Sequence, residues 1–367
     1  MLSLSPPVAV TATLIVSFAL AQSLVLSAHK HGHLTMDLPG AVQKFHLDPT
    51  PRVGGLAIYI AVAAAWFAIA GTVERKLLGT ILLAGMPALL IGLTEDVTKR
   101  VGVMARLLVT MFSGGLAAAL TGVGLTRVDL PLADQLLALW PFAVLFTAFA
   151  VGGVANAINI IDGFHGLASG TLMISLVGLA GVASSVGDVP LAVVALLVAA
   201  AVGGFWLVNF PWGKLFLGDG GAYFSGFALA WLTVELLARN PRVSPWASVL
   251  LCAYPTIEVM YSIVRRRKQR RSPGQADRHH LHSLVATQWV QPRLPQLAPN
   301  LRNAAVSVVM WGCAVVPVVP ALLFYDRPDV LLGALGACVV AYHLFYRRVA
   351  SSAAPVVPDA ESLKIRF

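Results

Sequence analysis

Residues 190–209 read PLAVVALLVAAAVGGFWLVN, a run of 20 residues that contains no charged side chain. An α-helix rises 1.5 Å per residue, so about 20 apolar residues cross the hydrocarbon core of a bilayer. The whole chain has the same character, because it is 57% hydrophobic and 12% charged, with a mean hydropathy of +0.78. A soluble all-helical protein would need charges on every helix. The composition therefore predicts an all-α, polytopic integral membrane protein.

Apolar windows of similar length recur along the chain and predict about eleven transmembrane helices. They lie near 8–28, 53–72, 77–94, 103–123, 138–158, 166–186, 190–209, 221–239, 244–264, 304–324 and 329–346. The first window lacks the positively charged start of a secretory signal, so we expect it to be retained as a helix. We predict a single transmembrane domain over 1–350, with a cytoplasmic loop at 265–303, followed by a cytoplasmic tail at 351–367.

The formal net charge is +9, and the basic residues cluster at the ends of apolar windows and in one hydrophilic loop. No basic domain able to follow a nucleic-acid duplex is present, so membrane orientation explains the charge better. By the positive-inside rule, the loop after the first window, the turn at 95–100 and the basic run at 265–271 face the cytoplasm. With an odd number of spans, this predicts an N-terminus outside and a C-terminus in the cytoplasm.

Unusual polar residues gather in five turns, at 44–55, 95–100, 156–165, 213–220 and 265–283. In the predicted topology all five turns fall on the cytoplasmic side, whereas simple helix caps would occur equally on both sides. Polar groups at the membrane boundary are costly and persist mainly where they serve a function. We therefore expect one shared site on the cytoplasmic face.

Four acids lie in these turns: Glu95 and Asp96, then Asp162, then Asp219 in FLGDGGAY. Separated carboxylates on one face are what a hard cation such as Mg²⁺ requires, usually together with substrate phosphates. The alternative is structural: an interfacial ion pair between Asp96 and Lys99, and a helix cap at Asp219. Because the acids share one face, we expect them to converge on a divalent ion.

The basic residues of the last polar turn fall into two groups. The run at 265–271 is typical of a topology signal that also attracts anionic lipid. The following ADRHHLHS combines Arg278 with three histidines, including His280 and His282, and suits a pyrophosphate. Zinc is the alternative ligand, but no cysteine lies nearby.

Five segments taken in order resemble the polyprenyl-phosphate N-acetylhexosamine-1-phosphate transferase superfamily, the MraY and WecA group. They are QKFHLDPTPRVGG, GLTEDVTKR followed by MARLL, NAINIIDGFHGLA, FLGDGGAY and ADRHHLHS, which together span residues 44–283. The last segment is more similar to the WecA branch than to the MraY branch. One segment alone would be weak evidence, but five in order make the match specific.

The resemblance implies a Mg²⁺-dependent transferase of the bacterial inner membrane, with Mn²⁺ as an alternative ion. Undecaprenyl phosphate would displace UMP from a UDP-activated amino sugar and begin a cell-envelope polysaccharide such as lipopolysaccharide. A homodimer is compatible with the family. Phosphoryl transfer of this kind depends mostly on positioning and charge stabilisation.

The resemblance also implies roles for particular residues. Asp219 and Asp162 would hold the metal, and Glu95 and Asp96 would form the acidic pair that acts as a base or organises the metal. The residues implied to contact substrates are Lys44, His46, Arg52, Lys99, Arg106, Asn156, Asn159, His165, Arg278, His280 and His282.

The sequence departs from the family pattern at three positions, where Glu95 replaces an aspartate, His165 an acid and Ala222 a serine. A relative that binds carrier or nucleotide sugar without turnover is therefore one alternative. A membrane transporter is another, although it predicts polar residues near mid-span and internal repeats.

Overall fold

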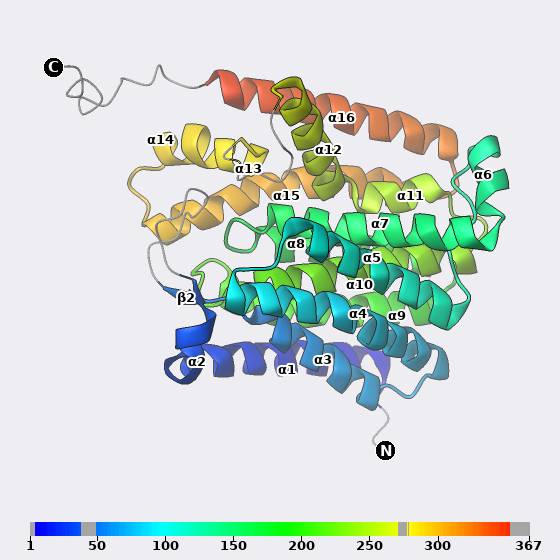
Figure 1. Ribbon diagram of the computed structural model, residues 1–367, viewed down its shortest axis with the longest axis horizontal. Coiled ribbons are helices and arrows are strands. Elements are labelled where there is room, and N and C mark those ends of the chain that lie inside the picture. The colour runs from blue at the N-terminus through cyan, green and yellow to red at the C-terminus, as the bar shows by residue number, and fades with distance from the viewer. Residues whose placement is uncertain (1–3, 38–48, 271–276, 278, 353–367) are drawn as a thin grey trace.

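The computed structural model describes residues 4–37, 49–270, 277 and 279–352. The helices are α1 (Pro6–Leu26), α2 (Ala28–Thr35), α3 (Gly54–Ala68), α4 (Thr72–Thr98), α5 (Val103–Thr121), α6 (Pro131–Leu137), α7 (Trp140–Ile161), α8 (Leu167–Ser185), α9 (Val189–Asn209), α10 (Gly218–Arg239), α11 (Pro245–Leu251), α12 (Ala253–Lys268), α13 (Leu281–Leu284), α14 (Gln291–Arg293), α15 (Pro299–Leu323) and α16 (Pro328–Ser351), with the π-helical η1 (Val285–Val290) between α13 and α14. Two short strands, β1 (Met36–Asp37) and β2 (Thr50–Pro51), pair antiparallel. The predicted all-α class is confirmed (Figure 1).

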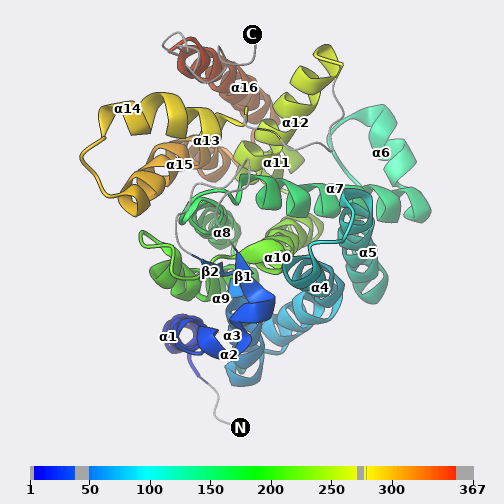
Figure 2. The ribbon, with the colours of Figure 1, turned by 60° about the vertical axis from the view of Figure 1, so that its left-hand side comes forward.

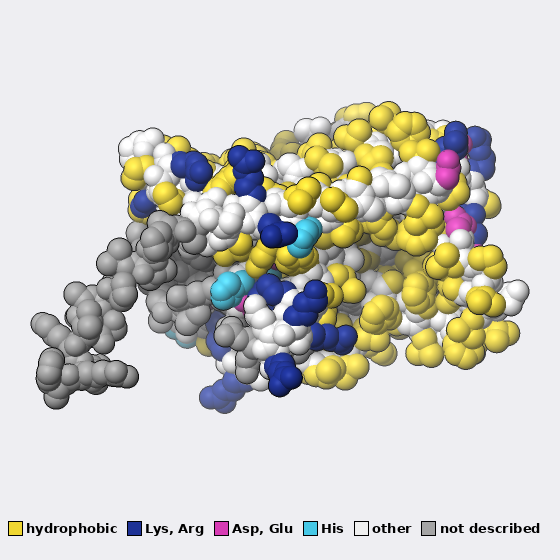
Figure 3. All heavy atoms as spheres, turned by 90° about the horizontal axis from the view of Figure 1, so that it is seen from above, with side chains coloured by type: hydrophobic (Ala, Val, Ile, Leu, Met, Phe, Trp, Pro, Cys, Tyr) yellow, Lys and Arg dark blue, Asp and Glu magenta, His cyan; other side chains and the backbone are white. Residues whose placement is uncertain are grey.

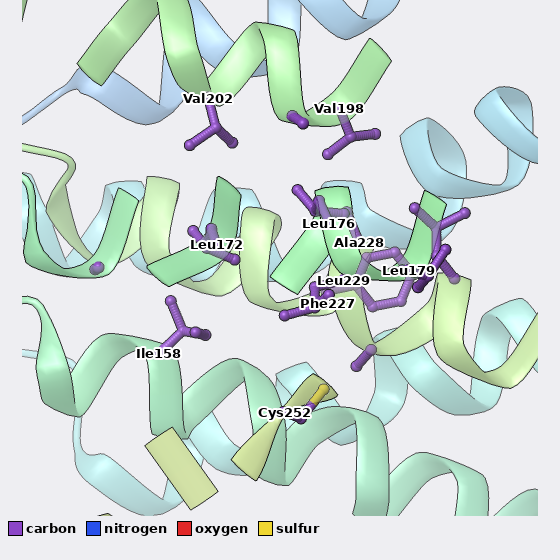
Figure 4. Close-up of a cluster of buried hydrophobic side chains, with 14 of the residues drawn as sticks. Ile158, Leu172, Leu176, Leu179, Val198, Val202, Phe227, Ala228, Leu229 and Cys252 are labelled. Carbon is purple, nitrogen blue, oxygen red and sulfur yellow. The ribbon is translucent and has the colours of Figure 1, made fainter. Parts of the chain in front are cut away.

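Helix α10 lies at the centre of the bundle, between α4, α7, α8 and α9 (Figure 2). Its apolar window is 89% buried, whereas the windows of the peripheral α1 and α16 are 22% and 17% buried. Figure 4 shows the core around it, where side chains from α7, α8, α9 and α10 interdigitate, among them Ile158, Leu176, Val198 and Phe227. A helix that is apolar on all sides belongs in such a centre.

The outer helices expose large apolar side chains to their surroundings. On α16 these include Leu332, Val339, Val340 and Leu344, and hydrophobic side chains cover much of the face seen in Figure 3. An aqueous surface would not carry a contiguous apolar face of this extent. The chain is a multi-pass membrane protein.

The structure has fewer long apolar helices than the eleven predicted windows. Nine helices among the described residues are long and apolar enough to span a bilayer, or ten if the bent pair α11 and α12 counts as one. The window at 53–72 contains only the 15-residue α3, because Ile69, Ala70 and Gly71 turn the chain into α4. At 1.5 Å per residue α3 is about 22 Å long, which is short of a full span.

The window at 244–264 is also different, because α11 and α12 meet at an angle of 79° at Cys252. Pro255, in the first turn of α12, has no N–H for a helix that would continue from α11, and its ring would clash with the preceding turn. The predicted loop at 265–303 is partly helical, since α13, η1 and α14 pack beside α15 (Figure 2).

Candidate active site

Arg52 connects three of the polar segments singled out in the sequence. It follows β2, and its guanidinium lies 3.1 Å from Asp219 Oδ1, 3.3 Å from Asp96 Oδ1 and 3.3 Å from Asp37 Oδ1. Asp96 lies near the end of α4, and Asp219 lies in the first turn of α10. The first polar loop, the acidic end of α4 and the glycine-rich start of α10 therefore meet at one end of the bundle.

Asp219 pairs with a second arginine. Arg106, near the start of α5, donates from Nη1 to Asp219 Oδ2 at 2.5 Å, while Arg52 Nη2 donates to Oδ1. Asp219 is only 6% exposed, and each of its carboxylate oxygens is paired with a guanidinium group. Each guanidinium has five N–H donors, so both arginines keep donors that can bind phosphate oxygens.

Asp96 caps α10 from a neighbouring helix. Its Oδ1 accepts the backbone N–H of Asp219, and its Oδ2 accepts that of Gly220, both at 3.0 Å. The first N–H groups of a helix have no partner within the helix, so a carboxylate there is stabilising. The ion pair between the Asp96 and Lys99 side chains, which was the structural alternative, is not formed, since Lys99 Nζ donates to the main-chain oxygen of Asp96 at 2.6 Å. Asp219 is the capped residue and not the cap.

Glycines let α10 come this close to α3 and α4. A Cβ on Gly92 of α4 would lie 2.3 Å from the Gly220 nitrogen, and a Cβ on Gly55 of α3 would lie 2.4 Å from the Gly221 nitrogen. No side chain fits between these backbones, as is usual where small residues line helix contacts in membranes. The close contacts bring Asp96 within reach of the α10 backbone.

Glu95 does not form a pair with Asp96. Its Oε2 accepts the backbone N–H of Val101 at 2.8 Å, so it stabilises the turn between α4 and α5. Adjacent residues on a helix point in different directions, which separates the two carboxylates. The two acids of the predicted pair therefore have different structural contacts. Glu95 stabilises the turn after α4, and Asp96 binds the start of α10.

Asp162 follows the last residue of α7, in the turn to α8. Burial raises its pKa to about 7; the positive charge of Arg52 opposes this shift, and the negative charges of Asp219 and Asp96 add to it. Its carboxyl group makes no hydrogen bond or ion pair to the residues described by the structure. Within the described ranges, Asp162 is thus an acid without a hydrogen-bond or ion-pair partner, and it lies beside the other two acids.

The two asparagines of the third segment face different neighbours. Asn156 Nδ2 donates to Thr110 Oγ1 at 2.7 Å and to the carbonyl of Gly152 at 2.8 Å, which ties α7 to α5. Asn159 Oδ1 accepts the hydroxyl of Tyr223 on α10 at 3.2 Å. Asn159 therefore lies on the side of α7 that faces the helix carrying Asp219.

His165 is buried under the loop between α9 and α10. Its Nδ1 lies 3.0 Å from the carbonyl oxygen of Pro211, its backbone N–H donates to Asn303 Oδ1, and its carbonyl accepts the hydroxyl of Ser307. His165 is 6% exposed. Its hydrogen bonds to Asn303 and Ser307 join α15 to the turn that carries Asp162. These contacts give His165 a supporting position, and its predicted substrate contact stays a prediction.

The histidine segment lies beside the Asp162 turn. The rings of His280 and His282 stack with centroids 5.3 Å apart, and His282 meets Phe164 edge-on at 5.6 Å. His280 Nδ1 lies 3.0 Å from Glu258 Oε1 on α12. The fifth predicted segment thus reaches the same end of the bundle as the other four. Lys44, His46 and Arg278 lie outside the described residues.

Comparison with known proteins gives a family match. The model of "Glycosyl transferase family 4" matches residues 78–237. The chain is 29% identical over 334 residues to the decaprenyl-phosphate N-acetylglucosaminephosphotransferase of Mycobacterium tuberculosis H37Rv, which covers 81% of this chain and 78% of that protein. Over residues 78–237 the chain is similar to glycosyl transferase family 4.

Two further relatives have related names. The probable undecaprenyl-phosphate N-acetylglucosaminyl 1-phosphate transferase of Bacillus subtilis is 28% identical over 269 residues, covering 72% of this chain and 74% of that protein. The undecaprenyl-phosphate alpha-N-acetylglucosaminyl 1-phosphate transferase of Escherichia coli K12 is 25% identical over 250 residues, covering 66% and 67%. The family 4 match includes Asp96, Arg106, Asp162 and Asp219, whereas Arg52 and the histidine segment lie outside it.

The carboxylates of this site fit a hard cation that is shared with a phosphate ligand. No group of three or more His, Cys, Asp or Glu side chains within the described ranges forms a complete metal cage. Mg²⁺, however, is commonly held by one or two carboxylates together with substrate phosphates and water. Asp162, which has no partner among the residues placed by the structure, and Asp219, with unused lone pairs, could supply those two carboxylates.

Some site residues were not recognised in the sequence. Asp37 pairs with Arg52, Tyr223 contacts Asn159, Glu258 holds His280, and Asp277 accepts from Arg265 and Arg266. One signal was available for Glu258, because it is the only charged residue in the apolar stretch 243–264. An ionisable residue in such a stretch is a candidate for function.

Proposed function

We propose that this protein transfers an N-acetylhexosamine 1-phosphate from a UDP-sugar to undecaprenyl phosphate and releases UMP. A phosphate oxygen of the carrier attacks the sugar-linked phosphorus, and the bond from that phosphorus to UMP breaks. The electron pair leaves with UMP, and a lipid-linked sugar pyrophosphate forms. The names of the three relatives supply the reaction class.

One observation carries the proposal: three carboxylates and two arginines from separate segments meet at one end of a membrane-spanning bundle. One substrate is a lipid and the other a soluble nucleotide sugar, so the reacting phosphates must meet at the membrane boundary. Arg52 and Arg106 would bind phosphate oxygens, and the rigid start of α10 would hold Asp219 toward them. Asp96 would act by positioning Asp219, and Glu95 by holding the neighbouring turn.

Mg²⁺ bound by Asp162 and Asp219 would neutralise the negative charge on the diphosphate. The proposal includes the orientation inferred from the basic loops, with the site on the cytoplasmic side of a bacterial inner membrane, and a role in starting an envelope polysaccharide. N-acetylglucosamine is the first sugar to test, because all three relatives are named for it.

The test uses purified protein, undecaprenyl phosphate, Mg²⁺ and UDP-sugars that carry a radiolabelled sugar. Label that appears in the lipid fraction, with UMP in equal amount, is the expected result. A protein that binds the nucleotide sugar without turnover would give neither product. A transporter would move label across a vesicle membrane without forming labelled lipid.

A further inference from the structure

Glu258 is a buried carboxylate with three hydrogen-bond partners. It lies on α12 and is 1% exposed. Its Oε1 is 3.0 Å from His280 Nδ1 and accepts the Leu281 backbone N–H at 3.2 Å, while its Oε2 accepts the Tyr342 hydroxyl of α16 at 2.7 Å. A single carboxylate thus joins two transmembrane helices to the histidine segment.

This contact determines which nitrogen of the His280 ring carries a proton. The Leu281 N–H and the Tyr342 hydroxyl both donate to Glu258, as they would to an ionised carboxylate, and an ionised carboxylate can only accept. The proton of the His280 contact must therefore lie on Nδ1. Nε2 is left as the nitrogen that can exchange a proton or a hydrogen bond with a ligand.

His280 in turn supports the contact with the acidic site. Its ring stacks on His282 with an interplanar angle of 6°, and His282 packs edge-on against Phe164, two residues after Asp162. His282 is 4% exposed, and its Nδ1 has no partner in the described part of the chain. The contacts run without a gap from Glu258 to the turn that carries Asp162.

The start of the histidine segment is fixed separately. Asp277 accepts from Arg265 and from Arg266 Nε at 3.1 Å, and it also accepts the His279 backbone N–H at 2.9 Å. The histidine segment is therefore attached to α12 at two places, at Asp277 and at Glu258. Asp277 also contacts the ring of the exposed His279 at 3.1 Å, whereas Glu258 contacts the buried ring of His280, which stacks on His282.

We propose that Glu258 is a positioning residue that holds His280, in its Nδ1-protonated form, toward the substrates of the transfer reaction. The inference rests on the proposed function. His280 is the group that meets the nucleotide sugar or its diphosphate, and Glu258 acts only through His280. Tyr342 supports Glu258 by donating to its other carboxylate oxygen, Oε2.

A double-mutant cycle tests this relationship. Glu258→Gln keeps the size of the side chain and removes its charge, and we expect it to lower kcat/KM by about tenfold or more, as is usual when the partner that orients an active-site histidine is lost. The loss should appear in kcat more than in the KM for the UDP-sugar. In a His280→Ala background the same change should alter kcat/KM by less than about twofold, because the effects of substituting two interacting residues are not additive.

Two variants control for packing. Glu235→Gln makes the same substitution in another buried glutamate, 16 residues after Asp219 on α10, which is about 24 Å along the helix. It should leave transfer unchanged. Tyr342→Phe removes one donor from Glu258 and keeps the carboxylate, so it should cost less than Glu258→Gln.

A spectroscopic measurement tests the ring itself. Nitrogen NMR of ¹⁵N-histidine-labelled protein, with His280 assigned by the signal lost in H280A, should show a protonated Nδ1 in the wild type and an altered signal in E258Q. Equal losses from E258Q in both backgrounds, or an unprotonated Nδ1 in the wild type, would overturn the positioning role. A wild-type protein that forms no labelled lipid overturns the proposed function instead, so the two failures are distinguishable.

Discussion

The two carboxylate oxygens of Asp96 accept the backbone N–H groups of Asp219 and Gly220, each at 3.0 Å. One acid therefore holds the main chain of the residue that carries another acid. The interaction links α4 to α10 and explains why the acids of two distant segments share one site. It also separates the expected effects of replacing them.

Asp219→Asn should abolish transfer and leave the protein folded. The amide keeps the size of the side chain but loses the charge that pairs with Arg52 and Arg106 and that would bind a cation. We expect turnover to fall by more than about a hundredfold, the range seen when a group that stabilises transition-state charge is removed. Label transfer and thermal unfolding are measured on the same preparation, and normal turnover would remove the metal assignment.

Asp96→Asn should lower both activity and stability. An asparagine has one oxygen in place of two, so one of the two N–H groups at the start of α10 loses its acceptor. An unsatisfied buried donor costs about 1–3 kcal/mol, so the midpoint of thermal unfolding should fall along with turnover. If the midpoint were unchanged while turnover was lost, Asp96 would have a direct chemical role in place of a positioning one.

Glu95→Asp should have a smaller effect than either of these changes. Shortening the side chain moves its carboxylate away from the Val101 N–H, which is exposed enough to bind water instead. We expect less than about a tenfold loss of kcat, since a solvated backbone group costs little. A loss as large as that of Asp219→Asn would show that Glu95 acts on the substrates.

Gly92→Ala should disrupt the contact between α4 and α10. The added Cβ would lie 2.3 Å from the Gly220 nitrogen, and a backbone atom cannot move aside as a flexible side chain can. Overpacking of this kind costs about 1–3 kcal/mol, so we expect a lower unfolding midpoint together with lost transfer. Gly153→Ala on α7 is the matched control, because a Cβ there meets nothing within 4 Å and should be tolerated.

Stability should depend on the protonation of His282. Burial lowers the pKa of His282 to about 4; the negative charge of Glu258 opposes this shift, and the charge of His280 adds to it. The unfolded chain therefore binds more protons than the folded one between about pH 6.5 and pH 4. The neutral His282 ring therefore makes its full contribution to the free energy of unfolding above pH 6.5, and this contribution is lost as the pH falls toward 4.

The check is a series of unfolding midpoints from pH 7.5 to pH 4.5 for the wild type and His282→Gln. A glutamine does not titrate, so the variant should lose less stability over this range. Parallel curves for the two proteins would contradict the prediction.

The sequence determined the class of the molecule and the segments that form its site. Apolar windows such as 190–209 require helices in a bilayer, because unpaired backbone groups are too costly there. Polar residues such as Asp162 and Asp219 stood out because the same environment makes them expensive. Composition and local pattern are properties of the chain itself, so they can be read without a structure.

Only the tertiary structure decided which side chains meet. Glu95 and Asp96 are adjacent in sequence, yet one holds a turn and the other holds α10, because the helix directs them differently. Asp96 and Asp219 are 123 residues apart, and Glu258 and His280 meet through a loop whose path no local pattern specifies. The bend at Cys252 and the short α3 likewise depend on packing. Hydrophobicity sets which segments enter the membrane, and close contact between particular backbones sets what each polar group can do.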